Sequence, residues 1–100
     1  MRATYNDSMS ETQKVLASFA IIDGVAVITL DDGKANALSL PMQQAFNSAL
    51  DQAQQAKLPV VITGRSGILS AGFDLKTLAA SGQPAVEMLN GGIEIALRLL

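Results

Sequence analysis

Two apolar, largely β-branched runs flank the dipeptide Asp23-Gly24, and this arrangement constrains the fold more than any other feature of the chain. The runs are Phe19-Ala20-Ile21-Ile22 and Val25-Ala26-Val27-Ile28-Thr29-Leu30. A two-residue hairpin turn needs positive φ at both central positions, which glycine adopts freely and aspartate tolerates. The segment from Val15 to Leu30 is therefore predicted to form a β-hairpin. Because both faces of its strands are apolar, we expect the sheet to be covered on both sides.

A helix and a further strand are predicted to follow the hairpin. Ser39 suits an N-cap, Pro41 fits the first turn, and Pro59 ends the helical pattern near Lys57. At helical spacing, the apolar face comprises Met42, Ala45, Phe46, Ala49, Leu50 and Ala53, and the polar face comprises Gln43, Gln44, Asn47, Ser48 and Gln54. Residues 60–63, Val-Val-Ile-Thr, read as a short buried strand. The helix has the length of a crossover between parallel strands.

The last part of the chain is predicted to hold a loop and two helices. Residues 64–72 are mostly small, a short helix begins at Phe73 and ends before Gly82, and Pro84 opens the last helix. The apolar positions of that helix are Val86, Leu89, Ile93, Ala96, Leu97 and Leu100, with Ile95 and Leu99 on other faces. Gly91-Gly92 inside it costs roughly 2 kcal/mol relative to two alanines, so packing must compensate. A helix that is apolar nearly all round is normally buried, so we infer a larger folded unit or a contact with another subunit.

Composition excludes several classes of protein. Hydrophobic residues make up 49% of the chain and charged residues only 16%, which argues against intrinsic disorder. The net charge of −2 gives no basic surface of the kind that nucleic acid requires. Cysteine and histidine are absent, so disulfides, the usual zinc sites, cysteine nucleophiles and histidine bases are excluded, and no metal site is expected.

The N-terminal residues lack the pattern of a targeting segment. Residues 1–14 are polar and include Asp7 and Glu11, whereas signal peptides need an apolar run and transit peptides avoid acids. No apolar stretch approaches the roughly 18 residues of a membrane helix. We expect residues 1–14 to be a flexible leader, residues 15–100 to form one folded part, no membrane association and a cytoplasmic location.

Two loops follow the carboxyl ends of the predicted parallel strands, the edge at which open α/β sheets bind ligands. They are Lys34–Leu38 and Gly64–Gly72, and they share one edge if the two strands are neighbours. The second loop leads into the helix start at Phe73, and the small side chains of Ala71 and Gly72 let a ligand approach the backbone. Main-chain amides there could bind an anionic oxygen.

Two other interpretations of the second loop are open at this point. Small residues before a helix also serve simply as a turn and a cap, and the spacing alone favours that interpretation. A phosphate-binding loop has less support, because Phe73-Asp74 stands where such loops need lysine and serine or threonine. The Gly-x-Gly-x-x-Gly motif of dinucleotide-binding folds does not occur.

Four segments, in order along the chain, resemble motifs of a known family. Ser70-Ala71-Gly72-Phe73-Asp74-Leu75-Lys76 is similar to the F-x-A-G-x-D-L/I-K motif of the crotonase superfamily, the enoyl-CoA hydratases and isomerases. Gly24 to Leu30 resembles the family's opening strand, Lys34 to Ser39 followed by Met42 resembles its helix entry, and Pro59 to Gly64 resembles the strand before the first motif. The resemblance covers roughly Phe19 to Leu78.

The resemblance implies an α/β fold of the ClpP/crotonase type, a spiral of ββα units. Residues 15–100 would be the N-terminal part of that domain, with the first turn and part of the second. It implies an enzyme that binds an acyl-CoA thioester and hydrates a 2-enoyl-CoA, with enoyl-CoA delta isomerisation as the alternative. Coenzyme A would be part of the substrate rather than a permanent cofactor, and the assembly would be a homotrimer or hexamer. A non-catalytic fragment for coenzyme A binding or assembly, and a nucleotide-binding domain, are the competing hypotheses.

The resemblance also implies roles for individual residues. The backbone N–H of Phe73 would be one of two oxyanion-hole donors to the oxygen of a thioester enolate. The residues that would contact coenzyme A or line the thioester end are Lys34, Ala35, Ala37, Ala71, Gly72, Asp74 and Leu75.

This chain departs from the family pattern in two places: at Phe73, and at Ile68-Leu69, where the family usually has Ala-Phe and the change is a conservative apolar one. The family often has alanine where Phe73 stands, so the donor survives but the ring would narrow or reshape the acyl pocket. The second oxyanion donor and the acid/base glutamates are expected beyond residue 100, so these 100 residues alone are expected to be inactive. Glu87 and Glu94 are read as solvated helix residues.

Overall fold

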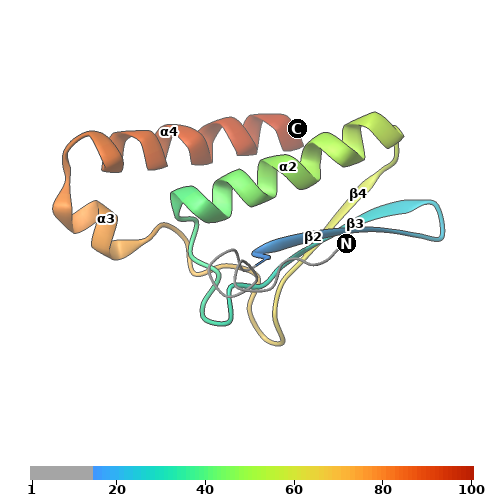
Figure 1. The fold of residues 1–100 in the computed structure, drawn as a ribbon, viewed down its shortest axis with the longest axis horizontal. Helices are drawn as coiled ribbons and strands as arrows, with labels where there is room; N and C mark the ends of the chain where they lie inside the picture. The colour runs from blue at the N-terminus through green and yellow to red at the C-terminus, as the bar shows by residue number, and fades with distance from the viewer. Residues whose placement is uncertain (1–14) are drawn as a thin grey trace, which may run out of the picture.

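The fold has two layers, a three-stranded sheet and a pair of helices that lies over it (Figure 1). The computed structural model describes residues 15–100, and the predicted leader, residues 1–14, lies outside them. The elements in chain order are β2 (Ala17–Ile22), β3 (Val25–Leu30), α2 (Leu40–Ala56), β4 (Val60–Thr63), α3 (Leu75–Ala80) and α4 (Gly82–Leu99).

The predicted hairpin and crossover are both confirmed. Asp23 and Gly24 have φ values of 52° and 77°, as the hairpin turn requires, and β2 pairs antiparallel with β3. β4 pairs parallel with β3, with Val61 opposite Val27, so the strand order is β2-β3-β4. Helix α2 is therefore the crossover, and the carboxyl ends of β3 and β4 lie at the same edge of the sheet.

The sheet has a helix layer on one face. The buried side chains of β3, Ala26, Ile28 and Leu30, alternate along the strand and face α2, where Met42 and Phe46 join the same core. The sequence-based expectation of cover on both faces is not met within residues 15–100. On the opposite face, Ile22 is 53% exposed and Val61 49% exposed, because α2 and α4 both lie on the other side (Figure 1).

Helix α2 begins and ends where the sequence predicts, but one side chain predicted to face the solvent is buried. The Ser39 hydroxyl accepts a hydrogen bond from the Met42 amide at 3.3 Å, and Lys57 ends the helix at φ 57°. Gln43, assigned to the polar face, is only 4% exposed. Its amide nitrogen donates to the carbonyls of Leu38 and Met88, and these bonds replace the hydrogen bonds to water that the side chain loses on burial.

The two C-terminal helices begin at other residues than predicted, and α4 buries another face. Helix α3 begins at Leu75 rather than Phe73, and α4 begins at Gly82 rather than Pro84. The buried residues of α4 are Ala85, Met88 and Ile95, not the predicted apolar stripe. Glycines on the buried face cause this choice: a Cβ at Gly91 would lie 2.0 Å from Oε1 of Gln43, so only glycine permits this closeness to α2.

The outward side of α4 therefore carries an apolar stripe that no described residue covers. Its members, all exposed, are Val86, Leu89, Ile93, Leu97 and Leu100. An exposed apolar row of this length is typical of a surface that a further segment or subunit covers. No helix within residues 15–100 is long and apolar enough to cross a membrane.

Candidate functional site

The two predicted loops lie against each other at the carboxyl edge of the sheet. The Ala71 amide donates to the carbonyl of Ala35 at 2.8 Å, and the Leu38 amide donates to the carbonyl of Gly72 at 2.7 Å. Ala37 and Gly72 form an isolated parallel bridge between these bonds. Of the predicted site residues, four thus come together, Ala35, Ala37, Ala71 and Gly72, and Phe73 follows Gly72 directly in the chain. Parallel pairing of β3 and β4 is the reason.

A buried asparagine, Asn36, fixes the relative position of the two loops. Its side chain is completely buried, and its amide nitrogen donates to the carbonyls of Leu30 at 2.8 Å and Leu69 at 3.0 Å. Its side-chain oxygen accepts from the Asp32 amide at 2.9 Å, and its own carbonyl accepts from the Ser70 hydroxyl at 2.7 Å. The backbone φ of Asn36 is 57°, a left-handed conformation that asparagine tolerates better than most residues.

Asn36 is a functional residue that the sequence motifs do not predict, although it lies inside the first of the two predicted loops. The available signal was chemical. An asparagine in a loop between a strand and a helix can take positive φ and can serve two carbonyls and an amide at once. The partners of these bonds become visible only in the fold, because Leu69 is far away in the sequence.

An aspartate tightens the first loop. Oδ1 of Asp32 accepts from the amides of Lys34 at 2.6 Å and Asn36 at 3.0 Å. Partial burial would raise the pKa of Asp32, but bonds from the backbone amides of Lys34, Asn36 and Ala37, with the charge of Arg65, outweigh it. The pKa of Asp32 therefore lies below its usual value, and its carboxylate is ionised in the folded loop at neutral pH.

The backbone N–H of Phe73 makes no hydrogen bond to any residue of the described chain, 15–100. The neighbouring groups are occupied: the Gly72 amide donates to the Ser70 hydroxyl at 3.0 Å, and the Gly72 carbonyl accepts from Leu38. At Gly72 φ is 93°, so the chain turns at the residue before the amide. Because α3 begins at Leu75, Phe73 belongs to the loop, and the prediction that its amide lies at a helix start is wrong. What remains is an amide donor on a fixed loop.

The other predicted binding residues are less involved in the loop pair. Lys34 is exposed, and only its backbone is engaged: its amide donates to Asp32, and its carbonyl accepts from the guanidinium of Arg65, which also pairs with Asp31 at 3.2 Å. Leu75 is 77% exposed. Neither side chain is held by a bond within residues 15–100 in a way that would fix a ligand-binding geometry.

The acidic side chains near the site and on α4 have structural roles or solvent contact. The hydroxyl of Thr77 donates to Asp74 at 2.6 Å and lowers the pKa of Asp74, which stands at the start of α3. Glu87 and Glu94 are both exposed, in agreement with their interpretation as solvated residues. Among residues 15–100 no group of three or more acidic side chains is placed to hold a metal ion.

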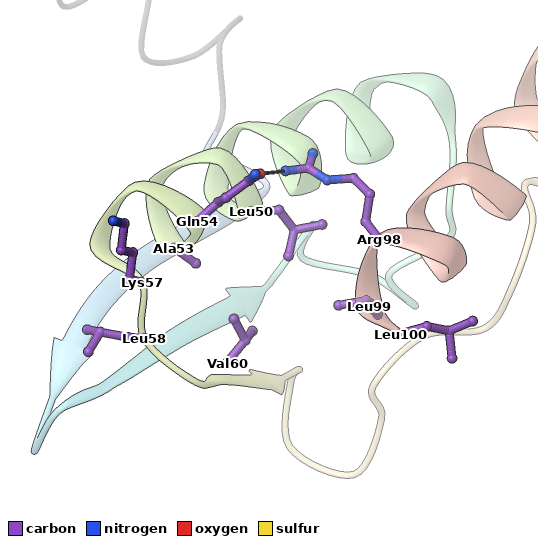
Figure 2. A pocket seen from close by; sticks show the side chains of 9 residues that line it. All are labelled: Leu50, Ala53, Gln54, Lys57, Leu58, Val60, Arg98, Leu99 and Leu100. Carbon is purple, nitrogen blue, oxygen red and sulfur yellow. Dashed lines mark hydrogen bonds between the residues drawn. The ribbon is translucent and has the colours of Figure 1, made fainter.

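A surface pocket lies at the other end of the sheet and includes none of the predicted site residues. Figure 2 shows it between the last turns of α2 and α4 and the beginning of β4. Its lining residues are Leu50, Ala53, Gln54, Lys57, Leu58, Val60, Arg98, Leu99 and Leu100. Arg98 spans its rim and bonds to Asp51 at 2.9 Å and Gln54 at 3.3 Å, so this end of α4 is fastened to α2.

Comparison with known proteins agrees with the sequence motifs and the fold. A profile of the family described as Enoyl-CoA hydratase/isomerase matches residues 20–94. The structure of an enoyl-CoA isomerase from Mycobacterium tuberculosis is 48% identical, with TM-score 0.79, over 84% of this chain and 37% of that chain. An enoyl-CoA hydratase/isomerase family protein from Pseudomonas syringae is 43% identical, with TM-score 0.79, over 90% and 37%.

A third structure carries a hydratase name. The enoyl-CoA hydratase EchA3 from Mycobacterium marinum is 42% identical, with TM-score 0.78, over 83% of this chain and 36% of that chain. The chain thus spans a little over a third of the length of these proteins and matches their N-terminal part. No match was found among proteins with curated descriptions.

We predict that Asn36→Ala lowers the free energy of unfolding by about 2–4 kcal/mol, because two carbonyls lose their donor and alanine is strained at positive φ. Asn36→Gly removes the same hydrogen bonds without the strain and should cost about 1 kcal/mol less. Urea denaturation of the two variants measures both contributions. Equal stability of Asn36→Ala and the wild type would contradict the role assigned to this side chain.

The lowered pKa of Asp32 predicts a pH-dependent contribution to stability. A carboxyl group whose pKa is depressed by folding stabilises the protein above its unfolded pKa, and the contribution disappears as pH falls through the folded pKa. The wild type should exceed Asp32→Asn by about 1 kcal/mol at pH 7, and the difference should shrink below about pH 4. Denaturation of both at several pH values measures this, with Glu94→Gln as an exposed control. A difference that persists unchanged at pH 2 would contradict the prediction.

Proposed function

Because the chain belongs to the enoyl-CoA hydratase/isomerase family, we propose that it is part of an enzyme that binds an acyl-CoA thioester and hydrates a 2-enoyl-CoA. The observation that carries this proposal is the Phe73 amide, a donor without a partner in residues 15–100, on a loop fixed by its neighbours. Since the chain spans about 37% of its solved relatives, the activity is proposed for the intact protein.

In this reaction the elements of water add across the C2–C3 double bond, and negative charge develops on the thioester oxygen. A backbone amide at hydrogen-bond distance from that oxygen stabilises the resulting enolate, and removal of one such donor costs about 10²–10³ in kcat. The Phe73 N–H is the donor that this part of the chain supplies. Because the donor is a main-chain group, it needs a rigid loop rather than a particular side chain.

The loop pair supplies the surface against which the thioester would lie. Lys34, Ala35 and Ala37 would contact the coenzyme A moiety, and Ala71, Gly72, Asp74 and Leu75 would flank the thioester. The small side chains at 35, 37, 71 and 72 support this assignment, because they leave the paired backbone open to a ligand. Coenzyme A enters as part of the substrate, and no permanent cofactor is proposed.

Delta isomerisation of a 3-enoyl-CoA is the second candidate, because the M. tuberculosis relative is called an isomerase in one structure and a probable hydratase in another. In that reaction a proton leaves C2 and one returns at C4, so the double bond moves into conjugation through the same enolate. Both reactions use the Phe73 amide in the same way. They differ in the groups that move protons, which we place outside these 100 residues. A polypeptide of residues 1–100 alone would bind without turnover.

We predict that the intact protein consumes the conjugated absorbance of crotonyl-CoA, whereas an isomerase instead generates such absorbance from a 3-enoyl-CoA. Phe73→Pro, which lacks the N–H, should lower kcat about 10²–10³-fold. Phe73→Ala keeps the N–H and is the matched control, with a clearly smaller loss. Absence of turnover with both substrates would refute the proposal, and so would equal activity of Phe73→Pro and Phe73→Ala. Turnover by residues 1–100 alone would refute the placement of the proton-transfer groups.

We also propose that the intact protein assembles as a homotrimer or hexamer. The exposed apolar stripe of α4 supports this, because a surface of that kind is commonly covered in an assembly. Sedimentation of the intact protein should give three or six times the protomer mass. Ile93→Gln with Leu97→Gln should shift the distribution toward smaller species, and Glu94→Gln should not. A monomer at all concentrations would contradict the proposed assembly, and the apolar stripe of α4 would then have to be covered by other residues of the intact protein.

A further inference from the structure

The ring of Phe73 packs on a helix that is separate from its own loop. A Cβ at Gly92 of α4 would lie 2.6 Å from Cε1 and 2.7 Å from Cζ of Phe73, closer than carbon atoms approach. The Phe73 ring therefore packs directly against the backbone of Gly92, and any residue with a Cβ would collide with it. The residue with the candidate oxyanion amide is held at its side chain by α4.

The backbone beside Phe73 is held by the same helix through Gln43. The Leu38 amide donates to the carbonyl of Gly72, the residue before Phe73, at 2.7 Å. The Leu38 carbonyl accepts from Nε2 of Gln43 at 3.1 Å, and that nitrogen also donates to the carbonyl of Met88 at 2.8 Å. A continuous series of hydrogen bonds thus joins the loop to α4.

Both connections end within one turn of α4. Met88 and Gly92 are four residues apart, so they are neighbours on the same face of the helix. Gly91, between them, makes room for Oε1 of Gln43, from which a Cβ would lie only 2.0 Å away. Local propensity disfavours the glycine pair, but tertiary contacts require both glycines: Gly91 makes room for Gln43, and Gly92 makes room for the Phe73 ring.

We propose that α4, through the Met88 carbonyl and the space at Gly92, positions the Phe73 amide for the thioester oxygen, with Gln43 and Gly92 as positioning residues. The inference rests on the proposed function: Gly92 acts through the Phe73 ring, and Gln43 acts through Leu38, whose amide holds the Gly72 carbonyl. An oxyanion donor must lie about 2.7–3.1 Å from the charged oxygen, and a displacement of about 1 Å can cost 10²-fold in rate. A turn that is merely well packed would affect stability and leave kcat unchanged.

The decisive experiment is a double-mutant cycle in the intact protein. Gly92→Ala should lower kcat for enoyl-CoA about 10–100-fold with KM changed less than about twofold, because the added methyl displaces the ring. In a Phe73→Ala background the same change should have no further effect on kcat, because the ring is gone. Asn90→Ala, an exposed change on the same turn, is the control and should match the wild type.

A spectroscopic measurement reports the donor itself. An aryl-conjugated enoyl-CoA absorbs at longer wavelength when its carbonyl accepts a strong hydrogen bond, so the wild type should shift its absorbance to the red on binding. Gly92→Ala should bind it with a smaller shift, and Asn90→Ala with the full shift. A loss of stability alone would change the melting temperature and leave this shift unchanged.

A second variant covers the case in which Gly92→Ala does not fold. Gln43→Met removes both hydrogen bonds at similar side-chain length and should lower kcat about tenfold or more, while the exposed Gln44→Met should not. Wild-type kcat in Gly92→Ala or Gln43→Met, or an equal effect of Gly92→Ala in both backgrounds, would overturn the inference alone. Absence of turnover and of the red shift in the wild type would overturn the proposed function, and this inference with it.

Discussion

The structure depends on one buried side-chain amide, that of Asn36, which holds together two loops that the chain itself places far apart. Parallel pairing brings the carboxyl ends of β3 and β4 to one edge of the sheet, but the backbone carbonyls of the loops that follow still need hydrogen-bond donors. Asn36 is such a donor, to Leu30, at the end of β3, and to Leu69, in the loop after β4. With these carbonyls satisfied, the loops can pair through Ala35 and Ala71. The candidate site is the product of that pairing.

A site built from main-chain groups has particular requirements. Its donor, the Phe73 amide, gains nothing from its own side-chain chemistry and depends on the rigidity of the backbone on both sides. Ser70 and Leu38 occupy the polar groups of Gly72, so the Phe73 amide, which has no partner within residues 15–100, lies directly beside backbone that is already hydrogen-bonded. The same reason explains why small residues prevail in the loop pair, since side chains would cover the donor.

Helix α4 shows how local cost and tertiary gain can conflict. Two consecutive glycines lower the stability of a helix. The apolar stripe of α4 is exposed to solvent and points away from α2. Periodicity alone therefore predicts the wrong buried face. The glycines reverse that preference because they let α4 approach Gln43 and Phe73 more closely than alanine would allow. Arg98 fastens the far end of the helix to α2 through Asp51. Close packing at one turn thus decides which face of α4 is buried and which is exposed to solvent.

The sequence by itself determined the elements that short-range chemistry controls. The Asp23-Gly24 turn, the Ser39 cap and the end of α2 near Lys57 each follow from the φ preference or hydrogen-bonding capacity of a residue and its immediate neighbours. The motifs around Gly72 and Phe73 likewise pointed to the family that the profile and the solved structures identify.

Only the tertiary structure decided the burial of Gln43, the role of Asn36 and the inner face of α4. The burial of Gln43 depends on a partner distant in the sequence, Met88. The inner face of α4 depends on glycine having no side chain, as at Gly92, where a Cβ would collide with the Phe73 ring. A hydrophobic pattern records which residues prefer to avoid water. It does not record which backbone carbonyls will need a donor, or where two segments must approach closely, because those needs arise once the chain has folded.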